Sequence, residues 1–221
     1  MRVIREGRSR EDCELLRLVT ARGDVRCRYY PAPTHKAVIF LGGIAGKWGS
    51  PARGLYSRLS LELADRGIGA LRIRFRHPGE LGECEFDALA GIEYLQRHGA
   101  HCVALIGHSF GAATAIRAAA LSNVVRAVVA LCPQSYGAGA VKTLGPQCAL
   151  LLIHGQEDAV LPAQCSIQLF RVAAEPKRLL LIPGAGHCLE EAAADVEYLV
   201  REWLSERLAA MAGPAPPVGG P

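Results

Sequence analysis

Long apolar runs are missing from this sequence of 221 residues. No segment approaches the roughly 20 consecutive apolar residues that a membrane-spanning helix needs. Residues 1–14 are charged throughout and do not have the apolar centre of a secretory signal. We therefore expect a cytoplasmic protein with no membrane partner.

Clustered basic charge is also missing. The formal net charge is +4, and the arginines are scattered, with no basic run interleaved with aromatic residues. A nucleic-acid-binding domain usually carries such a basic patch, so we expect no nucleic-acid partner. A basic patch that assembles only when separate segments fold together stays open as the alternative.

Metal-ligand spacing is absent as well. Eight cysteines occur, none in a Cys-x-x-Cys pair and none grouped with histidines as in a zinc site. Cys102, Cys132 and Cys148 lie within apolar runs, where a free thiol behaves as a small hydrophobe. We expect reduced, buried cysteines, no metal and no cofactor.

What the sequence does contain is an alternation of strand-like and helix-like segments, typical of a mostly parallel sheet with helices on both faces. Residues 15–20 and 25–30 alternate apolar and polar around Arg22-Gly23-Asp24, which predicts an antiparallel hairpin at the start of the sheet. Short runs rich in Val, Ile and Leu follow, as expected of buried parallel strands, at residues 37–41, 69–75, 102–106, 124–131, 149–153 and 178–182.

Helical patterns separate these runs. Leucines recur every fourth residue over 55–63, a three-residue step runs over 86–95, residues 112–121 are alanine-rich, and 196–204 are amphipathic. We expect one domain over residues 1–211, and a disordered Pro/Gly-rich tail over 212–221. The 15 residues 133–147 are too few for a lid domain, so we expect an open site.

The segment Gly107-His108-Ser109-Phe110-Gly111 follows one predicted strand and precedes the alanine-rich helix. A nucleophile elbow requires this strand-turn-helix context, in which a sharp turn lifts the serine oxygen clear of the sheet. The flanking glycines leave room for the neighbouring strand and helix. The helix N-terminus favours developing negative charge. Ser109 is therefore the candidate nucleophile.

Two further polar residues follow later strands. Asp158 comes just after the run 149–153, and His187 just after 178–182. The carboxyl ends of parallel strands meet at one edge of a sheet, where open α/β sheets build their sites. Glu157, beside Asp158, stays open as the alternative acid. His108 and His154 are interpreted as structural, and Cys188 as a packing residue.

Residues 36–208 resemble the α/β-hydrolase superfamily, and above all its compact, lidless members similar to dienelactone hydrolases and small carboxylesterases. The resemblance implies a Ser109–His187–Asp158 triad. It also implies an oxyanion hole formed by the backbone N–H groups of Phe110 and Ile44, with Gly43 as the alternative to Ile44. Two departures stand out: Gly42-Gly43 replaces the usual His-Gly pair, and the elbow carries serine where dienelactone hydrolases carry cysteine.

The expected activity is that of a serine hydrolase, which cleaves small to medium carboxylic esters or thioesters through an acyl-enzyme. Other chemistry on this fold, such as peptidase, lactonase or cofactor-free haloperoxidase activity, stays open, as does a non-catalytic scaffold. We expect a small-molecule acyl substrate. Trp48 is expected to form an apolar wall, and Arg76 or His77 to contact a polar substrate group, with a packed indole and solvated charges as the alternative. The sequence contains no indication of oligomeric state.

Overall fold

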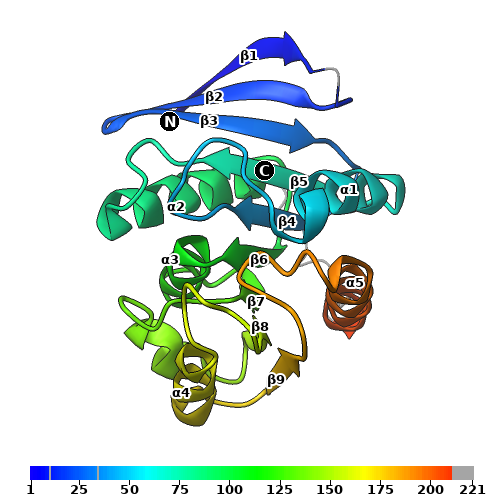
Figure 1. Ribbon diagram of the computed structural model, residues 1–221. Coiled ribbons are helices and arrows are strands. Elements are labelled where there is room, and N and C mark those ends of the chain that lie inside the picture. The colour runs from blue at the N-terminus through cyan, green and yellow to red at the C-terminus, as the bar shows by residue number, and fades with distance from the viewer. Residues whose placement is uncertain (10, 34, 211–221) are drawn as a thin grey trace.

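A computed structural model describes residues 1–9, 11–33 and 35–210 of the protein. Its strands form one nine-stranded sheet in the order β1-β2-β3-β5-β4-β6-β7-β8-β9 (Figure 1). The strands are β1 (Arg2–Arg8), β2 (Glu14–Thr20), β3 (Gly23–Tyr30), β4 (Lys36–Leu41), β5 (Gly69–Arg74), β6 (Cys102–His108), β7 (Val125–Leu131), β8 (Ala149–Gly155) and β9 (Lys177–Ile182). The helices are α1 (Pro51–Asp65), α2 (Leu81–Arg97), α3 (Phe110–Ala120), α4 (Gln164–Val172) and α5 (Ala193–Ala210), with a 3₁₀ turn η1 (Gly139–Thr143).

The sheet is parallel from β5 through β4 to β9, and antiparallel from β1 through β3 to β5. This arrangement confirms the predicted mostly parallel sheet with an N-terminal antiparallel hairpin, which is the α/β-hydrolase fold. Strand β1 extends the hairpin to three strands and was not predicted. Its register against β2 shifts between Arg5 and Gly7.

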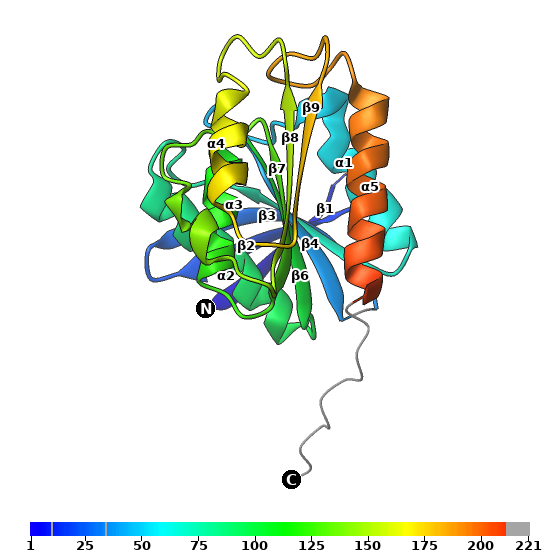
Figure 2. The same cartoon turned by 90° about the horizontal axis from the view of Figure 1, so that it is seen from below.

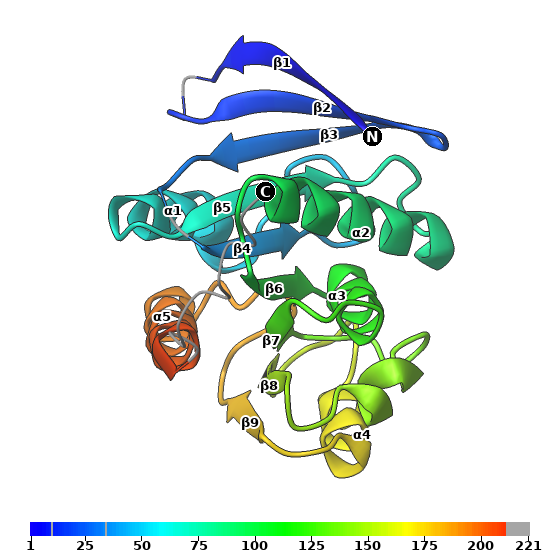
Figure 3. The same cartoon turned by 180° about the vertical axis from the view of Figure 1, so that it is seen from behind.

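Helices cover both faces of the sheet (Figures 2 and 3). Figure 2 shows α1 and α5 on one face and α2, α3 and α4 on the other. Every residue of β6 and of β8 is buried, which explains their unbroken apolar runs. The alanines of α3 let its backbone approach the sheet closely, and nine of its 11 residues are buried.

The strand order places the site. The chain passes from β4 to β5 on one side and then returns to β6 on the other side of β4. Loops that leave the carboxyl ends of β4 and β6 therefore diverge, and open α/β sheets bind ligands in the crevice between such loops. The candidate nucleophile Ser109 follows β6, and the candidate oxyanion loop follows β4.

The sequence predicted no lid between β7 and β8 and a disordered tail after residue 211. The connection between β7 and β8 contains the short turn η1 and no lid, as predicted. The expected tail at 212–221 lies outside the described residues. Among the described helices, none is both long and apolar enough to cross a lipid bilayer.

Gly107 and Gly111 make the closest approach between α3 and the sheet. A Cβ atom on Gly107 would overlap the backbone of Gly111 and Ala112, and one on Gly111 would overlap the backbone of Leu41 and Gly42. Because backbone cannot move aside cheaply, Gly107→Ala should lower the free energy of unfolding by roughly 3 kcal/mol or more.

Gly82→Ala is the matched control, because nothing lies within 4 Å of its Cβ position on α2. That change should be neutral or stabilising by up to about 1 kcal/mol. Urea denaturation followed by circular dichroism measures both. Equal stability of Gly107→Ala and the wild type would contradict the close-approach argument.

Candidate active site

The turn between β6 and α3 holds Ser109 in a strained backbone conformation. Its φ is 56° and its ψ is −118°, outside the regions that L residues favour. The N–H of Ser109 donates to the carbonyl of Leu131 at 2.8 Å, so the turn is tied to the end of β7. The serine stands at the N-terminus of α3, as the elbow motif predicts.

Asp158 and His187 meet at the same edge of the sheet. The Nδ1 atom of His187 lies 2.7 Å from Oδ2 of Asp158. The other carboxylate oxygen of Asp158 accepts the N–H groups of Val160 and Leu161, each at 2.8 Å. Glu157, the alternative acid, is exposed to solvent. The geometry thus pairs the histidine with Asp158.

Hydrogen bonds hold Asp158 in its ionised form. Burial alone would raise the pKa of this carboxyl group, but the N–H of Leu161, the His187 ring and the N–H of Val160 outweigh it, and the pKa is lowered. An ionised Asp158 can fix the orientation of His187 and stabilise its protonated form.

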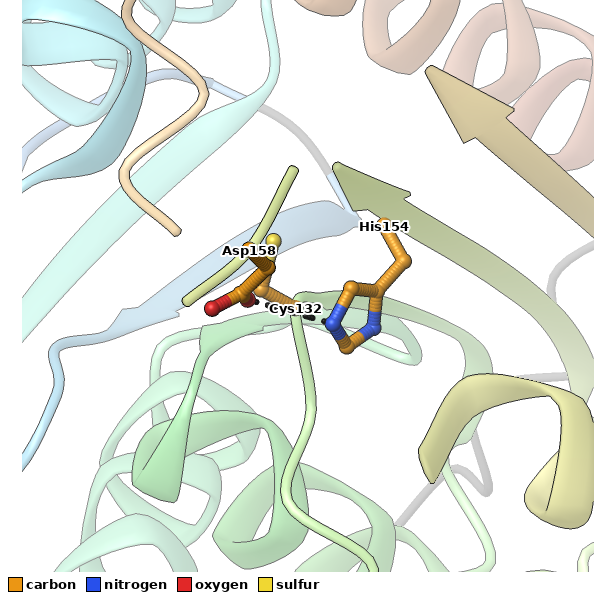
Figure 4. Close-up of side chains that lie close together, drawn as sticks. All are labelled: Cys132, His154 and Asp158. Atoms are coloured by element: carbon orange, nitrogen blue, oxygen red, sulfur yellow. Dashed lines mark ion pairs between the residues drawn. The ribbon is translucent and has the colours of Figure 1, made fainter. Parts of the chain in front are cut away.

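A second, buried histidine lies beside the same oxygen of Asp158 that His187 contacts (Figure 4). His154 leaves β8 beside the side chains of Cys132 and Asp158, and its Nε2 lies 3.1 Å from Oδ2 of Asp158. The same nitrogen lies 3.0 Å from the carbonyl of Leu161, while Nδ1 lies 2.7 Å from Oγ of Ser166. With a proton on Nε2, the ring donates to the Leu161 carbonyl and accepts the hydroxyl proton of Ser166 at Nδ1, while Nε2 also lies close to the Asp158 carboxylate.

Cys132, His154 and Asp158 are residue types that can bind a metal ion, and their possible ligand atoms lie within 4.8 Å of one another. Both ring nitrogens of His154 are already engaged by protein partners, as described above. Burial raises the pKa of the Cys132 thiol to about 12, which disfavours the thiolate that binds metals. The donor set therefore suits support of the carboxylate better than metal binding.

The side chain of His108, inside the elbow, contacts the backbone of the candidate base His187. Its Nε2 lies 2.9 Å from the carbonyl of His187, and the two rings are 4.8 Å apart at 49°. Burial lowers the pKa of His108 to about 4, so the ring is neutral near pH 7 and donates its Nε2 proton to this carbonyl. His108 thereby fixes the backbone that carries His187.

Ser109 and His187 line a common cleft of about 380 Å³. The cleft is formed by Gly43, Ile44, Ala45, Gly46, Gly49, Ser50, Pro51, His108, Ser109, Val160, His187 and Cys188. Ser109 is only 8% exposed, so the site is less open to solvent at the serine than expected. The loop after β4 and the segments around residues 160 and 188 wall in the serine without any lid.

The residues of the candidate oxyanion hole lie in this cleft or next to it: Gly43 and Ile44 line it, and Phe110 follows Ser109. Phe110 begins α3, where the first N–H groups of a helix have no acceptor within the helix. A Cβ atom on Gly43 would lie 3.8 Å from Cβ of Ser109, so the loop after β4 passes directly beside the elbow. Ile44 lines the cleft with its side chain 60% exposed. The choice between the N–H groups of Ile44 and Gly43 stays a prediction.

The three predicted substrate contacts lie away from the cleft. Trp48 stacks on the guanidinium of Arg28 at 4.5 Å and is not among the lining residues. Arg76 is bound by Asp87, with Nε 2.5 Å from Oδ1. His77 is exposed and borders a different cleft, together with Arg76. The structure therefore does not bring Trp48, Arg76 or His77 to Ser109.

The cysteines follow the expected pattern with one important exception. Six of the eight are buried, as expected of thiols in a core. Cys188 is exposed and lines the cleft beside His187, so its interpretation as a packing residue was wrong. The backbone carbonyl of Cys188 accepts the N–H of Ala52, which ties the histidine loop to the start of α1.

Several supporting residues were missed in the sequence. Val160 contributes both an N–H to Asp158 and an exposed side chain to the cleft. An aspartate that accepts N–H groups two and three residues later is a common local turn, so this contact was accessible from the sequence. Ser50 and Pro51 line the cleft without any motif that would have predicted it.

The lowered pKa of His108 makes stability depend on pH. The unfolded histidine binds a proton near pH 6.5, whereas the folded one does so only near pH 4. Between these values the unfolded state holds more protons, so stability must fall as the pH falls. We expect His108 to account for a loss of up to roughly 3 kcal/mol from pH 7 to pH 4.

His108→Gln retains a donor for the His187 carbonyl but does not titrate, so it should lose less stability over this range. Urea unfolding of both proteins at pH 7, 5.5 and 4.5 gives the difference. Parallel pH curves for the two proteins would rule out His108 as the cause.

Comparisons with known proteins identify the fold and the family of the chain. A model of the Dienelactone hydrolase family matches residues 73–203, more than half of the chain. The structure is similar to Est1E from Butyrivibrio proteoclasticus, with a TM-score of 0.75 and 17% identity over 88% of this chain and 99% of that one. It is also similar to a dienelactone hydrolase from Anabaena variabilis, with a TM-score of 0.74 and 21% identity over 89% and 98% of the two chains.

A curated relative matches a shorter stretch. The uncharacterized protein YfhR of Escherichia coli is 58% identical over 38 residues, which is 17% of this chain and 13% of the length of YfhR. The family match covers more than half of the chain, including Ser109, Asp158 and His187, so it decides the assignment. The chain belongs to the dienelactone hydrolase family.

Proposed function

We propose that this protein is a serine hydrolase that cleaves carboxylic esters of small to medium acyl groups. The observation that carries the proposal is one cleft lined by both Ser109 and His187, with Asp158 bound to Nδ1 of the histidine. The elbow holds the serine at a helix N-terminus, where negative charge is favoured.

The serine hydroxyl needs a base because it is a weak nucleophile. His187 accepts the hydroxyl proton through Nε2 as Ser109 attacks the ester carbonyl carbon. Asp158 keeps the Nδ1 proton on the imidazole and stabilises the imidazolium. His187 then donates the proton to the leaving alcohol, and water cleaves the acyl-enzyme with the same histidine as base.

The developing oxyanion needs donors in place before the reaction. The N–H of Phe110 and that of Ile44 or Gly43 are the proposed pair. Each donor of such a hole is typically worth about 3 kcal/mol in the transition state. Because the loop after β4 packs against the elbow, its backbone needs no large movement to reach the oxyanion.

The cleft favours an uncharged acyl group. Its 12 lining residues include no Lys, Arg, Asp or Glu. Ile44, Pro51 and Val160 are among its apolar lining residues, and a volume of about 380 Å³ suits a small ligand. A carboxylate on the substrate would lose its hydration there without meeting a cation.

Lactone hydrolysis is the second candidate, and membership of the dienelactone hydrolase family favours it. The same serine, histidine and donors would open a cyclic ester. The charge of the cleft again argues for a neutral lactone rather than one that carries a carboxylate.

A fluorophosphonate probe tests the nucleophile. The wild type should be labelled on Ser109, and Ser109→Ala should not be labelled. Ser205→Ala, on α5, is the matched control and should be labelled like the wild type. Ser109→Ala and Asp158→Asn should each lower kcat for p-nitrophenyl butyrate by about 10⁴-fold, as loss of a triad member does elsewhere. Unchanged labelling of Ser109→Ala would overturn the proposal.

A pair of substrates of similar size tests the preference for neutral acyl groups. We expect kcat/KM for p-nitrophenyl butyrate to exceed that for p-nitrophenyl hemisuccinate by about tenfold or more, because desolvating the extra carboxylate costs more than 1.4 kcal/mol. Val160→Lys places a cation at the cleft rim and should narrow the difference. A wild-type preference for the hemisuccinate would contradict the inferred substrate class.

A further inference from the structure

A second cleft, of about 470 Å³, lies beside the β2–β3 turn and the end of β5. We name it the arginine cleft. Its lining residues are Arg22, Gly23, Asp24, Arg26, Arg74, Phe75, Arg76 and His77. We propose that the arginine cleft binds a small molecule through a phosphate group, with Arg26 and Arg74 as its ligands to the phosphate oxygens.

Arg26 and Arg74 face each other across neighbouring strands. The strands β3 and β5 are neighbours in the sheet (Figure 1). Arg26 and Arg74 are direct partners in their antiparallel register, so both side chains leave the same face of the sheet, about 5 Å apart at Cβ. Like charges directly opposite each other destabilise a sheet. Such a pair becomes favourable when an anion lies between the two guanidinium groups.

The remaining charges of the arginine cleft are already balanced. Arg76 binds Asp87 and Glu83, at 2.5 and 2.7 Å. Arg22 binds the second oxygen of Glu83 at 2.7 Å. Asp24, the acidic residue of the lining, is engaged at 2.8 Å by an arginine of the neighbouring strand β2.

Arg26 and Arg74, by contrast, form no ion pair within the part of the chain that the structure describes. Arg26 is exposed and Arg74 is half-buried, so solvent reaches both. Asp24 is occupied by its own arginine partner and is poorly placed to neutralise them. Two uncompensated cations therefore remain in a hollow of ligand size.

Guanidinium groups select the chemistry of the ligand. The planar fork of arginine presents paired N–H donors that match phosphate oxygens, and two forks on one face suit a group with several charged oxygens. His77 at the rim offers a further ring nitrogen. A volume of about 470 Å³ lies within the range of small-molecule sites and leaves room for more than the phosphate alone.

The arginine cleft is separate from the cleft of Ser109. The two share no lining residue. The loop of residues 76–80 lies between them, because His77 borders the arginine cleft while Pro78 and Gly79 pack against Gly46 and Ile44 of the other. The phosphate site is therefore proposed as an addition to the ester site, and it does not depend on the esterase proposal.

Binding of pyrophosphate, measured by isothermal titration calorimetry at low ionic strength, tests the proposal. The wild type should bind one pyrophosphate per chain and should gain thermal stability as the ligand is added, because the ligand binds the folded state. Succinate, which is a dianion without phosphate oxygens, should bind at least about tenfold more weakly.

Arg26→Gln and Arg74→Gln should each weaken pyrophosphate binding by about tenfold or more, since each removes a charged pair of hydrogen bonds. Arg178→Gln is the matched control: Arg178 is also an exposed strand arginine, and its loss changes the net charge equally. That variant should bind within about twofold of the wild type. Without ligand, Arg74→Gln should unfold at the same temperature as the wild type or higher, because it removes a like-charge pair.

Three results would overturn the proposal. The first is a wild type that binds no pyrophosphate. The second is an equal loss of binding in Arg178→Gln and Arg74→Gln, which would indicate attraction by net charge. The third is equal affinity for succinate and pyrophosphate, which would indicate a general anion surface. Labelling of Ser109 by fluorophosphonate is read independently, so failure of either proposal leaves the other intact.

Discussion

The close approach of α3 to the sheet at Gly107 and Gly111 is the constraint on which the rest of the site depends. With side chains at these positions, the helix would stand away from β4 and β6. The turn that holds Ser109 at a φ of 56° could then relax, and the N-terminus of α3 would no longer face the loop after β4. Strain at the serine is sustained because packing on both sides of it leaves no alternative.

A second layer of contacts fixes the acid and the base. Asp158 is held by two backbone N–H groups and by His154, and His187 is held through its own carbonyl by His108. Each of these contacts is largely shielded from water, so each carries more weight than it would on the surface. The candidate base is thus oriented at both its ring and its backbone, which is the pre-organisation that proton transfer requires.

Much of this architecture could be predicted from the sequence, because buried parallel strands and elbow turns leave local patterns. Helix α4 was not predicted: it has only nine residues, so its apolar face is short, and only Ser166 and Leu169 on it are buried. Trp48 and Arg76 were placed on the correct edge of the sheet, but their side chains turn toward Arg28 and Asp87. Loop conformation depends on such distant partners, which no local pattern encodes.

The arginine cleft also depends on contacts between distant parts of the chain, which a local sequence pattern does not encode. Arg26 and Arg74 are far apart in the chain, and only the pairing of β3 with β5 brings them together. A charge pattern along the sequence cannot reveal a register between strands that belong to different parts of the fold. The facing pair of Arg26 and Arg74 is therefore visible only once the sheet order is known.

The unpredicted strand β1 has a consequence for how the protein behaves in concentrated solution. It forms one margin of the sheet, where unpaired backbone groups could recruit a strand from another molecule. This strand contains Arg2, Arg5 and Arg8, and its register against β2 shifts between Arg5 and Gly7. Charge and irregularity of this kind discourage edge-to-edge pairing. The lack of apolar alternation that concealed β1 in the sequence is thus the property that protects the sheet from aggregation.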